Sequence, residues 1–209
     1  MVNHNKKKRL LELFSGSGSV GKVAKKLGYE VTSVDILFPA TYKCDILKWD
    51  YKKYPPGYFD VIWASPPCTE FSYAKTVGER DIDGALKLVR RALKIIEYFE
   101  PDFYAIENPV GHLRHMKPMK GRKDRKTISY CKYGYSYRKN TDIWTNSSFE
   151  PRKCEGQHMC AYKKKHGFHE YTVQSGPRME GHTSQEPIKK IEERYKIPQL
   201  LLKDIFKGF

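Results

Sequence analysis

The sequence has no hydrophobic run long enough to cross a membrane as a helix, which takes about 20 consecutive apolar residues. Its first ten residues, MVNHNKKKRL, carry cations but no apolar stretch ahead of a small-residue cleavage site. Cysteines are few: there are five, an odd number, and they are widely spaced, which is unlike a disulfide framework. These absences predict an intracellular protein, cytoplasmic or nuclear and not secreted, with no membrane partner.

Acidic residues are also scarce, with 24 Asp and Glu against 39 Lys and Arg and a formal net charge of +15. The imbalance is largest over residues 114–139, which contain ten Lys or Arg and a single acid, Asp124. Tyrosine-rich stretches such as YCKYGYSY lie in the same half of the chain. Cations hold phosphates and exposed tyrosine rings stack on bases, so this composition predicts a basic, aromatic surface for a nucleic acid.

Strands and helices alternate along the first half of the chain. Short apolar runs predict four buried strands, at 10–14, 30–36, 59–65 and 103–108. Helical spacing of apolar residues predicts two helices, at 20–28 and 81–99. This alternation predicts a Rossmann-like α/β fold, with a mostly parallel sheet and helices on both of its faces.

The pattern weakens after residue 110. Residues 112–127 are basic and polar and predict a loop over the carboxyl edge of the sheet. Two further strands are expected, in TISYCKYG and over 141–146. Residues 147–187 show little periodicity and predict a small irregular subdomain, followed by two helices with a break at Pro198.

A glycine-rich loop, GSGSVG (residues 16–21), follows the first predicted strand and opens the first helix. It matches the G-x-G-x-x-G pattern, in which glycines allow the backbone to approach a nucleotide-like cofactor. Asp35, at the end of the second strand, can bond ribose hydroxyls. The pattern indicates a dinucleotide or S-adenosylmethionine and does not choose between them.

The stretch VIWASPPCTEFS ends a buried strand on two prolines and then places Cys68 on a rigid bend. A thiolate there can add to carbon 6 of a pyrimidine and make carbon 5 nucleophilic, which is covalent catalysis. Glu107 ends the strand FYAIEN at the same sheet edge and can bond N3 and the exocyclic amine of cytosine. On the residues alone, a buried structural cysteine and a surface carboxylate stay open as alternatives.

Together these pieces resemble the DNA (cytosine-5) methyltransferases. The matching segments occur in the family's order, over roughly residues 10–110: LFSGSGSVG, SVDI, CDIL, SPPCTEFS and IENP. The resemblance implies that S-adenosylmethionine is the methyl donor, that Cys68 attacks carbon 6 and that Glu107 engages N3 and the amine. It also implies a cofactor site made of Phe14, Ser15, Gly16, Gly18, Val20, Asp35, Ile36, Asp45, Ile46 and Pro66.

Beyond residue 110 the chain departs from the family pattern. YGYSYRKNTDIW stands where the family has a Gln-x-Arg-x-Arg strand, so Tyr137 replaces Gln, Lys139 replaces the first Arg and Thr141 replaces the second. One cation expected near the target base is therefore missing. Lys139 and, as a substitute from the neighbouring position, Arg138 are the further catalytic residues that the resemblance implies.

The predicted organisation has three parts: a catalytic core over 1–146, a small basic region resembling a target-recognition domain over 147–187, and C-terminal helices over 188–209 that return to the core. The middle part holds a group of possible zinc ligands, Cys154, His158, Cys160, His166 and His169. Their spacing does not match a standard zinc finger, so no metal is predicted, and zinc stays an open alternative.

The predicted function is transfer of a methyl group from S-adenosylmethionine to carbon 5 of cytosine in double-stranded DNA. The protein is expected to act as a monomer, through a covalent Cys68 adduct and base flipping. Two alternatives stay open: the same chemistry on RNA such as tRNA, and a non-catalytic DNA-binding protein that resembles a methyltransferase.

Overall fold

The computed structural model describes residues 7–135, 137–154, 171–172, 186–187 and 195–207. Within them, seven strands form one sheet in the order β3-β2-β1-β4-β5-β7-β6. In chain order these strands are β1 (Arg9–Leu13), β2 (Glu30–Asp35), β3 (Tyr42–Lys43), β4 (Val61–Ala64), β5 (Phe103–Pro109), β6 (Arg125–Ser129) and β7 (Asn140–Thr145). A separate parallel pair joins β8 (Tyr171–Thr172) to β9 (Glu186–Pro187).

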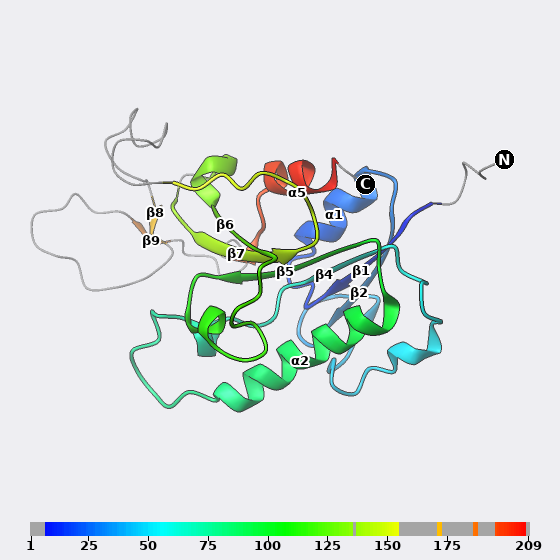
Figure 1. Cartoon of the computed structure of the whole chain (residues 1–209), viewed down its shortest axis with the longest axis horizontal. Helices are drawn as coiled ribbons and strands as arrows, with labels where there is room; N and C mark the ends of the chain where they lie inside the picture. Colours follow the sequence, from blue (N-terminus) through cyan, green and yellow to red (C-terminus); the bar gives the residue numbers. More distant parts are fainter. Residues whose placement is uncertain (1–6, 136, 155–170, 173–185, 188–194, 208–209) are drawn as a thin grey trace, which may run out of the picture.

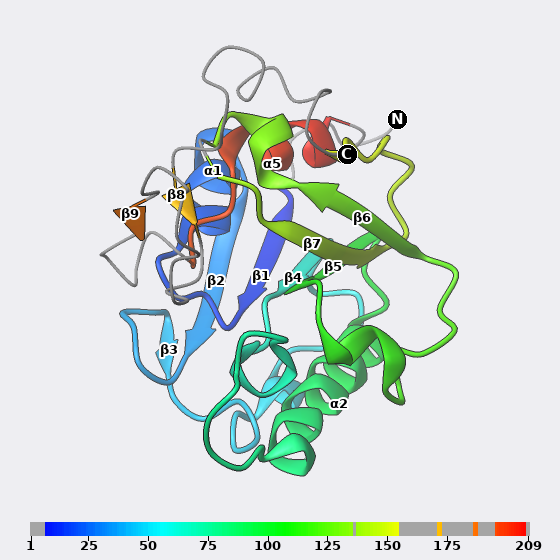
Figure 2. The same cartoon turned by 90° about the vertical axis from the view of Figure 1, so that its left-hand side faces the viewer.

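Helices cover both faces of the seven-stranded sheet, as Figures 1 and 2 show. On one face lie α1 (Ser19–Lys26) and α5 (Gln199–Phe206), and on the other lies α2 (Ile82–Phe99). Because alternate strand residues point to opposite faces, each face has its own core. Leu10 and Phe103 pack with α1 and α5, whereas Leu11 and Ile106 pack with α2. This arrangement confirms the predicted α/β fold with helices on both faces.

Strands β1 to β5 are parallel to one another, while β7 runs antiparallel to β5 and β6 antiparallel to β7. The predicted mostly parallel sheet is therefore confirmed. In such a sheet the carboxyl ends of the parallel strands meet at one edge, where α/β proteins bind their ligands.

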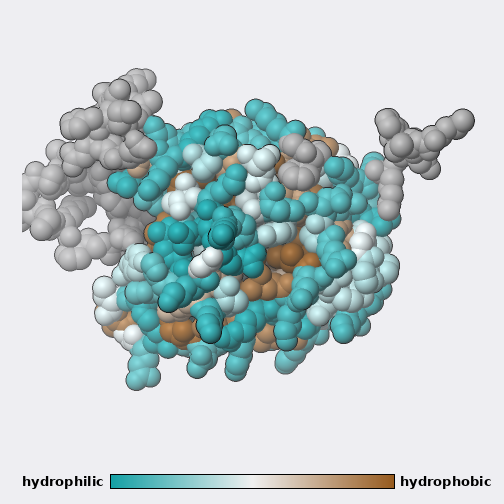
Figure 3. Space-filling model, in the orientation of Figure 1, coloured by the Kyte–Doolittle hydropathy of each residue, from teal (hydrophilic) through white to brown (hydrophobic). Residues whose placement is uncertain are grey.

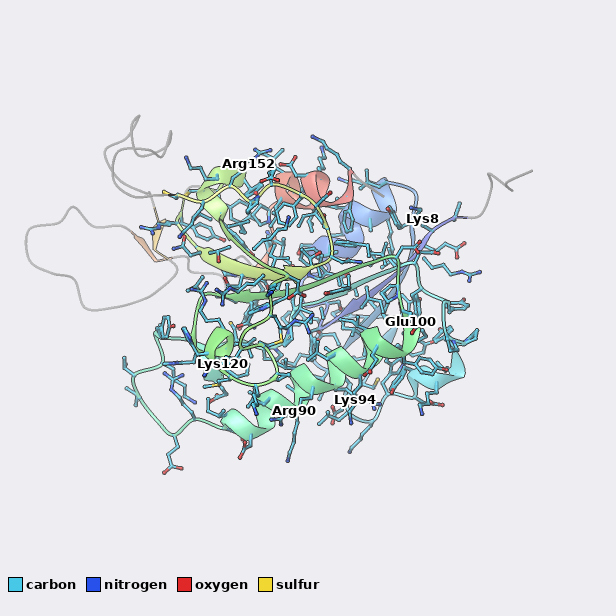
Figure 4. The ribbon with its side chains drawn as sticks, in the orientation of Figure 1. Lys8, Arg90, Lys94, Glu100, Lys120 and Arg152 are labelled. Carbon is cyan, nitrogen blue, oxygen red and sulfur yellow. The ribbon has the colours of Figure 1, made fainter. Side chains whose placement is uncertain are left out.

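Helix α2 follows its predicted pattern closely. Its amino end is capped by Asp81, whose Oδ1 accepts a hydrogen bond of 2.8 Å from the Gly84 N–H. Its buried stripe includes Leu86, Val89, Ile96 and Phe99. Arg90 and Lys94 extend from the opposite, solvent-facing side (Figure 4).

The segment after residue 110 differs from the prediction in two respects. Part of the predicted loop over 112–127 is ordered as a 3₁₀ turn, η3 (His112–His115), and as the start of β6. The strand expected in TISYCKYG ends at Ser129 and continues as a second 3₁₀ turn, η4 (Tyr130–Tyr133). Strand β6 lies at the edge of the sheet, and edge strands tolerate the charged residues that had suggested a loop.

The carboxyl-terminal part is described only in places. Helix α5 begins directly after Pro198, as predicted, and packs on α1. Residues 188–194, where the preceding helix was predicted, lie outside the described residues, as does most of 147–187.

None of the helices that the structure describes has the length and apolarity to span a membrane. The face seen in Figure 3 is mainly hydrophilic, with apolar side chains gathered near its centre.

Candidate active site

The parallel pairing of three neighbouring strands ends in register at the carboxyl edge of the sheet. Leu13 of β1 pairs with Ala64 of β4, and Ala64 pairs with Ile106 of β5. The glycine-rich loop follows the first strand, the turn with Cys68 follows the second, and Glu107 directly follows Ile106. The parallel register therefore brings the predicted cofactor loop, nucleophile and ring acid to one edge.

The Cys68 turn is tied to β5 by specific contacts. The buried amide of Asn108 donates a hydrogen bond of 2.9 Å from Nδ2 to the Pro66 carbonyl. Cys68 then begins the 3₁₀ turn η2 (Thr69–Phe71), with its carbonyl accepting from the Phe71 N–H at 3.0 Å. This turn packs on Gly111 so closely that a Cβ at Gly111 would lie 2.3 Å from the Phe71 carbonyl oxygen. A side chain at residue 111 would displace the turn that carries the thiol.

The Cys68 side chain is partly buried, and its thiol responds to two charged neighbours. Burial raises the pKa of Cys68 above its ordinary value, the Lys139 ammonium lowers it, and the Glu107 carboxylate raises it. Lys139 is thus the cation that favours the thiolate. Because a thiolate is the nucleophilic form, the site needs this cation to offset the effect of burial.

Glu107 is buried, with 6% of its surface exposed, and two side chains approach its Oε1. Lys139 Nζ lies 4.0 Å away, and the Tyr130 hydroxyl donates a hydrogen bond of 3.2 Å. Lys139 Nζ also lies 4.8 Å from the centre of the Tyr130 ring. We call Glu107, Tyr130 and Lys139 the Glu107 cluster.

Lys139 and Arg138, the two cations predicted for the catalytic site, lie in different surroundings. Lys139 belongs to the Glu107 cluster, whereas Arg138 is exposed, with Nε 3.5 Å from Oδ1 of Asn140. The tyrosines predicted to offer exposed stacking surfaces are instead largely interior. Tyr130, Tyr133 and Tyr137 are each 6% exposed or less. That prediction was wrong for these rings, because the η4 turn directs them into the core beneath α5.

The glycine-rich loop adopts the backbone that its sequence predicts. Gly16 and Gly18 have φ angles of 50° and 65°, in the left-handed region that glycine favours. The Gly16 N–H donates to Oδ2 of Asp35 at 2.8 Å, and the other oxygen of Asp35 accepts from the N–H groups of Leu37 and Phe38. Asp35 therefore fixes the loop after β1 to the loop after β2.

Other features of this loop leave bonding capacity for a ligand. The hydroxyls of Ser15 and Ser17 are shielded from solvent and bond to no group of the described residues. Phe14 has a φ of 57°, unusual for a residue with a side chain, and Ile36 is 60% exposed although it is apolar. Buried hydroxyls without partners and an exposed apolar residue fit a nucleoside with polar and flat apolar parts.

The remaining predicted cofactor residues occupy different environments. Oδ1 of Asp45 accepts from the Leu47 N–H at 2.9 Å, in the turn after β3. Ile46 and Pro66 are buried at the same edge. The Val20 side chain, in the first turn of α1, is 1% exposed and packs in the core, so only its backbone can face a ligand.

Sequence reasoning did not single out Glu12, a carboxylate inside the apolar run of β1. It is 3% exposed, and its Oε2 accepts from the Gly21 N–H at 3.0 Å. Burial raises its pKa to about 7, against the opposing effect of hydrogen bonds from Gly21 and Val20. A Cβ at Gly21 would lie 2.6 Å from Oε2 of Glu12, so this glycine allows α1 to approach the carboxylate. The signal that could have revealed it is an acidic residue in the middle of the apolar run LLELF.

Several cations of the basic segment 114–139 are engaged within the protein. Arg114 forms a two-pronged ion pair with Asp142, at 2.8 and 2.5 Å, and Arg122 pairs with Asp124 at 2.6 Å. Beyond this segment, Arg152, labelled in Figure 4, pairs with Asp204 of α5. The exposed cations of the segment are Lys117, Lys120, Lys123, Arg125 and Arg138. About half of this positive charge is therefore available to an external partner.

Of the possible zinc ligands, only Cys154 is described. It is buried, and its N–H donates to Oγ of Ser129 at 2.9 Å. The other four, His158, Cys160, His166 and His169, lie outside the described residues. Among the described residues no group of three or more potential metal ligands occurs.

The order and direction of the strands are those of the Rossmann-like fold of S-adenosylmethionine-dependent methyltransferases. A solved structure described as a DNA modification methyltransferase encoded within a prophage, from E. coli, has the same fold, with a TM-score of 0.52 and 18% sequence identity. The match covers 66% of this chain and 46% of that structure, so this chain spans less than half of its length.

The chain belongs to the C-5 cytosine-specific DNA methylases, whose family model matches residues 9–141. It is by family a DNA (cytosine-5)-methyltransferase. It is also 38% identical over 168 residues to a Frog virus 3 (isolate Goorha) protein named "Probable DNA (cytosine-5)-methyltransferase", covering 73% of this chain and 77% of that one. The family membership predicted from the sequence is therefore confirmed.

Proposed function

We propose that this protein methylates carbon 5 of cytosine in double-stranded DNA through a covalent adduct with Cys68. The observation that carries the proposal is the mutual influence of Cys68, Lys139 and Glu107 at the carboxyl edge of the sheet. Nucleophile, cation and acid are the three groups that addition to a cytosine ring requires.

Each protein group has a defined part in this reaction. The Cys68 thiolate, favoured by Lys139, forms a bond to carbon 6, and the electron pair displaced from the 5,6 double bond becomes available at carbon 5. The carboxyl group of Glu107, in its protonated form, donates to N3 and accepts from the exocyclic amine, which stabilises the negative charge that develops on the ring. After methylation a base takes the proton from carbon 5, the double bond re-forms, and Cys68 leaves as thiolate.

S-adenosylmethionine, when bound, supplies a methyl group that is activated by its sulfonium. Asp35 would bond the ribose, and Ile36 would contact the adenine. The Ser15 and Ser17 hydroxyls and the glycine-rich backbone would face the polar parts of the molecule. The proposed set is the ten residues from Phe14 to Pro66 that the family resemblance implies, with Ser17 added because its buried hydroxyl bonds to no group of the described residues.

The target base has to leave the duplex to reach this site. Glu107 is 6% exposed, so a stacked and paired cytosine cannot contact it. Rotating a base out costs roughly a few kcal/mol, and phosphate contacts can offset this cost. Exposed cations of the segment 114–139 would make those contacts, and residues 147–187 would form a compact target-recognition region. The protein would act as a monomer.

The test is methyl incorporation from labelled S-adenosylmethionine into duplex DNA and, in parallel, into tRNA. The expected result is 5-methylcytosine in the digested DNA and none above background in the tRNA. Label in tRNA alone would overturn the choice of substrate. Label in neither nucleic acid, from a folded protein that binds S-adenosylmethionine, would overturn the catalytic function.

A further inference from the structure

The segment that leads from Lys139 into β7 lacks one of the cations that the family pattern predicts there. Thr141 stands where the related enzymes' strand has its second arginine, and Thr141 is fully buried in β7. Strand β7 pairs with β5, and Ile143 of β7 lies opposite Glu107 of β5. A short hydroxyl side chain two residues before Ile143 leaves space on the Glu107 side of the strand, since residues two apart share a face.

Tyr130 fills the place beside Thr141. Its N–H donates to the Lys139 carbonyl at 3.0 Å, which brings η4 alongside the start of β7. The Thr141 side chain is near enough to Tyr130 to influence the pKa of its hydroxyl. From this position the Tyr130 hydroxyl donates to Oε1 of Glu107 at 3.2 Å.

We infer that Tyr130 is a positioning residue for methyl transfer, whose hydroxyl holds Oε1 of Glu107 and so fixes the direction in which the carboxyl group meets the cytosine ring. This inference rests on the proposed function. Tyr130 belongs to η4 and so lies outside β7.

The surroundings of Tyr130 suit a fixed donor. Its side chain is fully buried, and its ring packs against those of Tyr135 and Tyr137, with centroids 5.5 and 6.3 Å apart. Burial, more than any other cause, raises its pKa well above the ordinary value, and the charge of Glu107 adds to this effect. The hydroxyl therefore keeps its proton over the working pH range and can donate only along a direction set by packing.

Lys139 alone would not hold Glu107 as firmly. Its Nζ lies 4.0 Å from Oε1, beyond hydrogen-bond distance, so it acts as a charge and leaves the direction of the carboxyl group undefined. Reactions of this kind are sensitive to misplacement of a reacting group by about 1 Å, which can cost about 10²-fold in rate.

The test compares Tyr130→Phe with Tyr133→Phe. Tyr133 lies in the same 3₁₀ turn and is equally buried, but its hydroxyl is directed to a different group and accepts from the Arg152 N–H at 3.0 Å. Tyr130→Phe should lower kcat by about 10- to 100-fold, with KM for DNA and Kd for S-adenosylmethionine within about two-fold of wild type. Tyr133→Phe should keep wild-type kcat, although it lowers thermal stability.

A rescue experiment sharpens the test. Tyr130→Ala should lose at least as much kcat as Tyr130→Phe, and adding Thr141→Arg to it should restore a substantial part, because an arginine then has both space and the Glu107 carboxylate as its partner. Thr141→Arg alone should lower activity, since the Tyr130 ring occupies that space. A double variant no more active than Tyr130→Ala would contradict the exchange of tyrosine for arginine.

The outcomes separate this inference from the proposed function. Wild-type kcat in Tyr130→Phe, in a protein that methylates DNA, would overturn the inference and leave the proposed function intact. An equal loss in Tyr133→Phe would also overturn it, because the effect would then come from packing of the turn. A folded wild-type protein without methyl transfer would overturn both.

Discussion

The parallel part of the sheet, β1 to β5, and its antiparallel edge, β6 and β7, contribute to the candidate site in different ways. In the parallel part, the position of each functional residue follows from topology, because Asp35 ends β2, Cys68 follows β4, and Glu107 lies in β5 just beyond its pairing with β4. At the antiparallel edge, Lys139 and Tyr130 reach Glu107 only through their side chains and through the local turn η4. The position of a residue at a parallel strand end is fixed by the fold, whereas a side-chain contact can be made from more than one position in the sequence.

The two regions also use charge differently. In the parallel part, Glu12 is a buried carboxylate held by backbone N–H groups of α1. Around β6 and β7, Arg114 pairs with Asp142 and Arg122 pairs with Asp124, and a separate set of cations is exposed. The positive charge that is available to a partner is therefore smaller than the net charge of the sequence indicates. Each of the following predictions perturbs one side of this comparison.

The largest effect is expected from Cys68→Ser. Methyl transfer should fall by at least about 10³-fold, since a serine hydroxyl is not ionised near neutral pH and cannot add to carbon 6. Binding of S-adenosylmethionine, measured by calorimetry, should stay within a few-fold, because the glycine-rich loop is a separate part of the edge. Cys44→Ser, at a partly buried thiol outside the Glu107 cluster, is the control and should retain activity.

Gly111→Ala should give the next largest effect. The new Cβ would lie 2.3 Å from the Phe71 carbonyl oxygen, so the turn that carries Cys68 must shift. A decrease in kcat of about 10- to 100-fold is expected, by the same sensitivity to misplacement. Gly57→Ala, at a φ of 71° with nothing within 4 Å of the added Cβ, is the control for strain alone. Equal kcat in the two variants would mean that contact with Gly111 does not hold the turn.

Glu12→Gln should change how stability depends on pH. Glu12 has a pKa of about 7 in the folded protein against 4.5 as its ordinary value, so the folded state binds more protons between these two values. This group's contribution is therefore fully present below pH 4.5 and is lost as the pH rises to 7, by about 3 kcal/mol. Urea unfolding of Glu12→Gln should lack this loss. The control, Glu30→Gln at an exposed carboxylate, should follow the wild-type curve.

The smallest catalytic effect is expected from neutralising exposed cations. Replacing Lys117, Lys120 and Lys123 by Gln should reduce the slope of log affinity for DNA against log salt by up to about 3 units, at about 0.9 per phosphate contact. At saturating DNA, kcat should stay at the wild-type value. The same replacement of Lys87, Arg90 and Lys94 on the outer face of α2 is the control. A wild-type slope in the first variant would show that these lysines do not meet phosphates.

Strands β1, β2, β4 and β5 and helices α1 and α2 were predictable from short apolar runs and helical stripes, whereas β3, which is two residues long, was not predicted. Adjacent parallel strands end at one edge, so the proximity of Cys68 and Glu107 followed from the order of the motifs. Strand β6 was harder to predict, since an edge strand carries Arg and Lys that resemble those of a loop. The buried tyrosines were misjudged because an aromatic ring suits both a binding surface and a core.

The choice between Arg138 and Lys139 could not be made from the sequence. The two are consecutive and lie just before β7, and only the path of the chain into this strand decides which of them approaches Glu107. The contact between Tyr130 and Glu107 was equally hidden, because it joins residues 23 positions apart through a 3₁₀ turn that no periodicity announces.

The most direct measurement of the covalent mechanism uses duplex DNA in which fluorine replaces the hydrogen at carbon 5 of the target cytosine. After methyl transfer there is no proton to remove from carbon 5, so Cys68 cannot leave and the protein stays joined to the DNA. We predict a protein–DNA adduct that requires S-adenosylmethionine, resists denaturation and maps by mass spectrometry to the peptide containing Cys68. Methylation of ordinary duplex DNA without any such adduct, or an adduct on another cysteine, would contradict the mechanism.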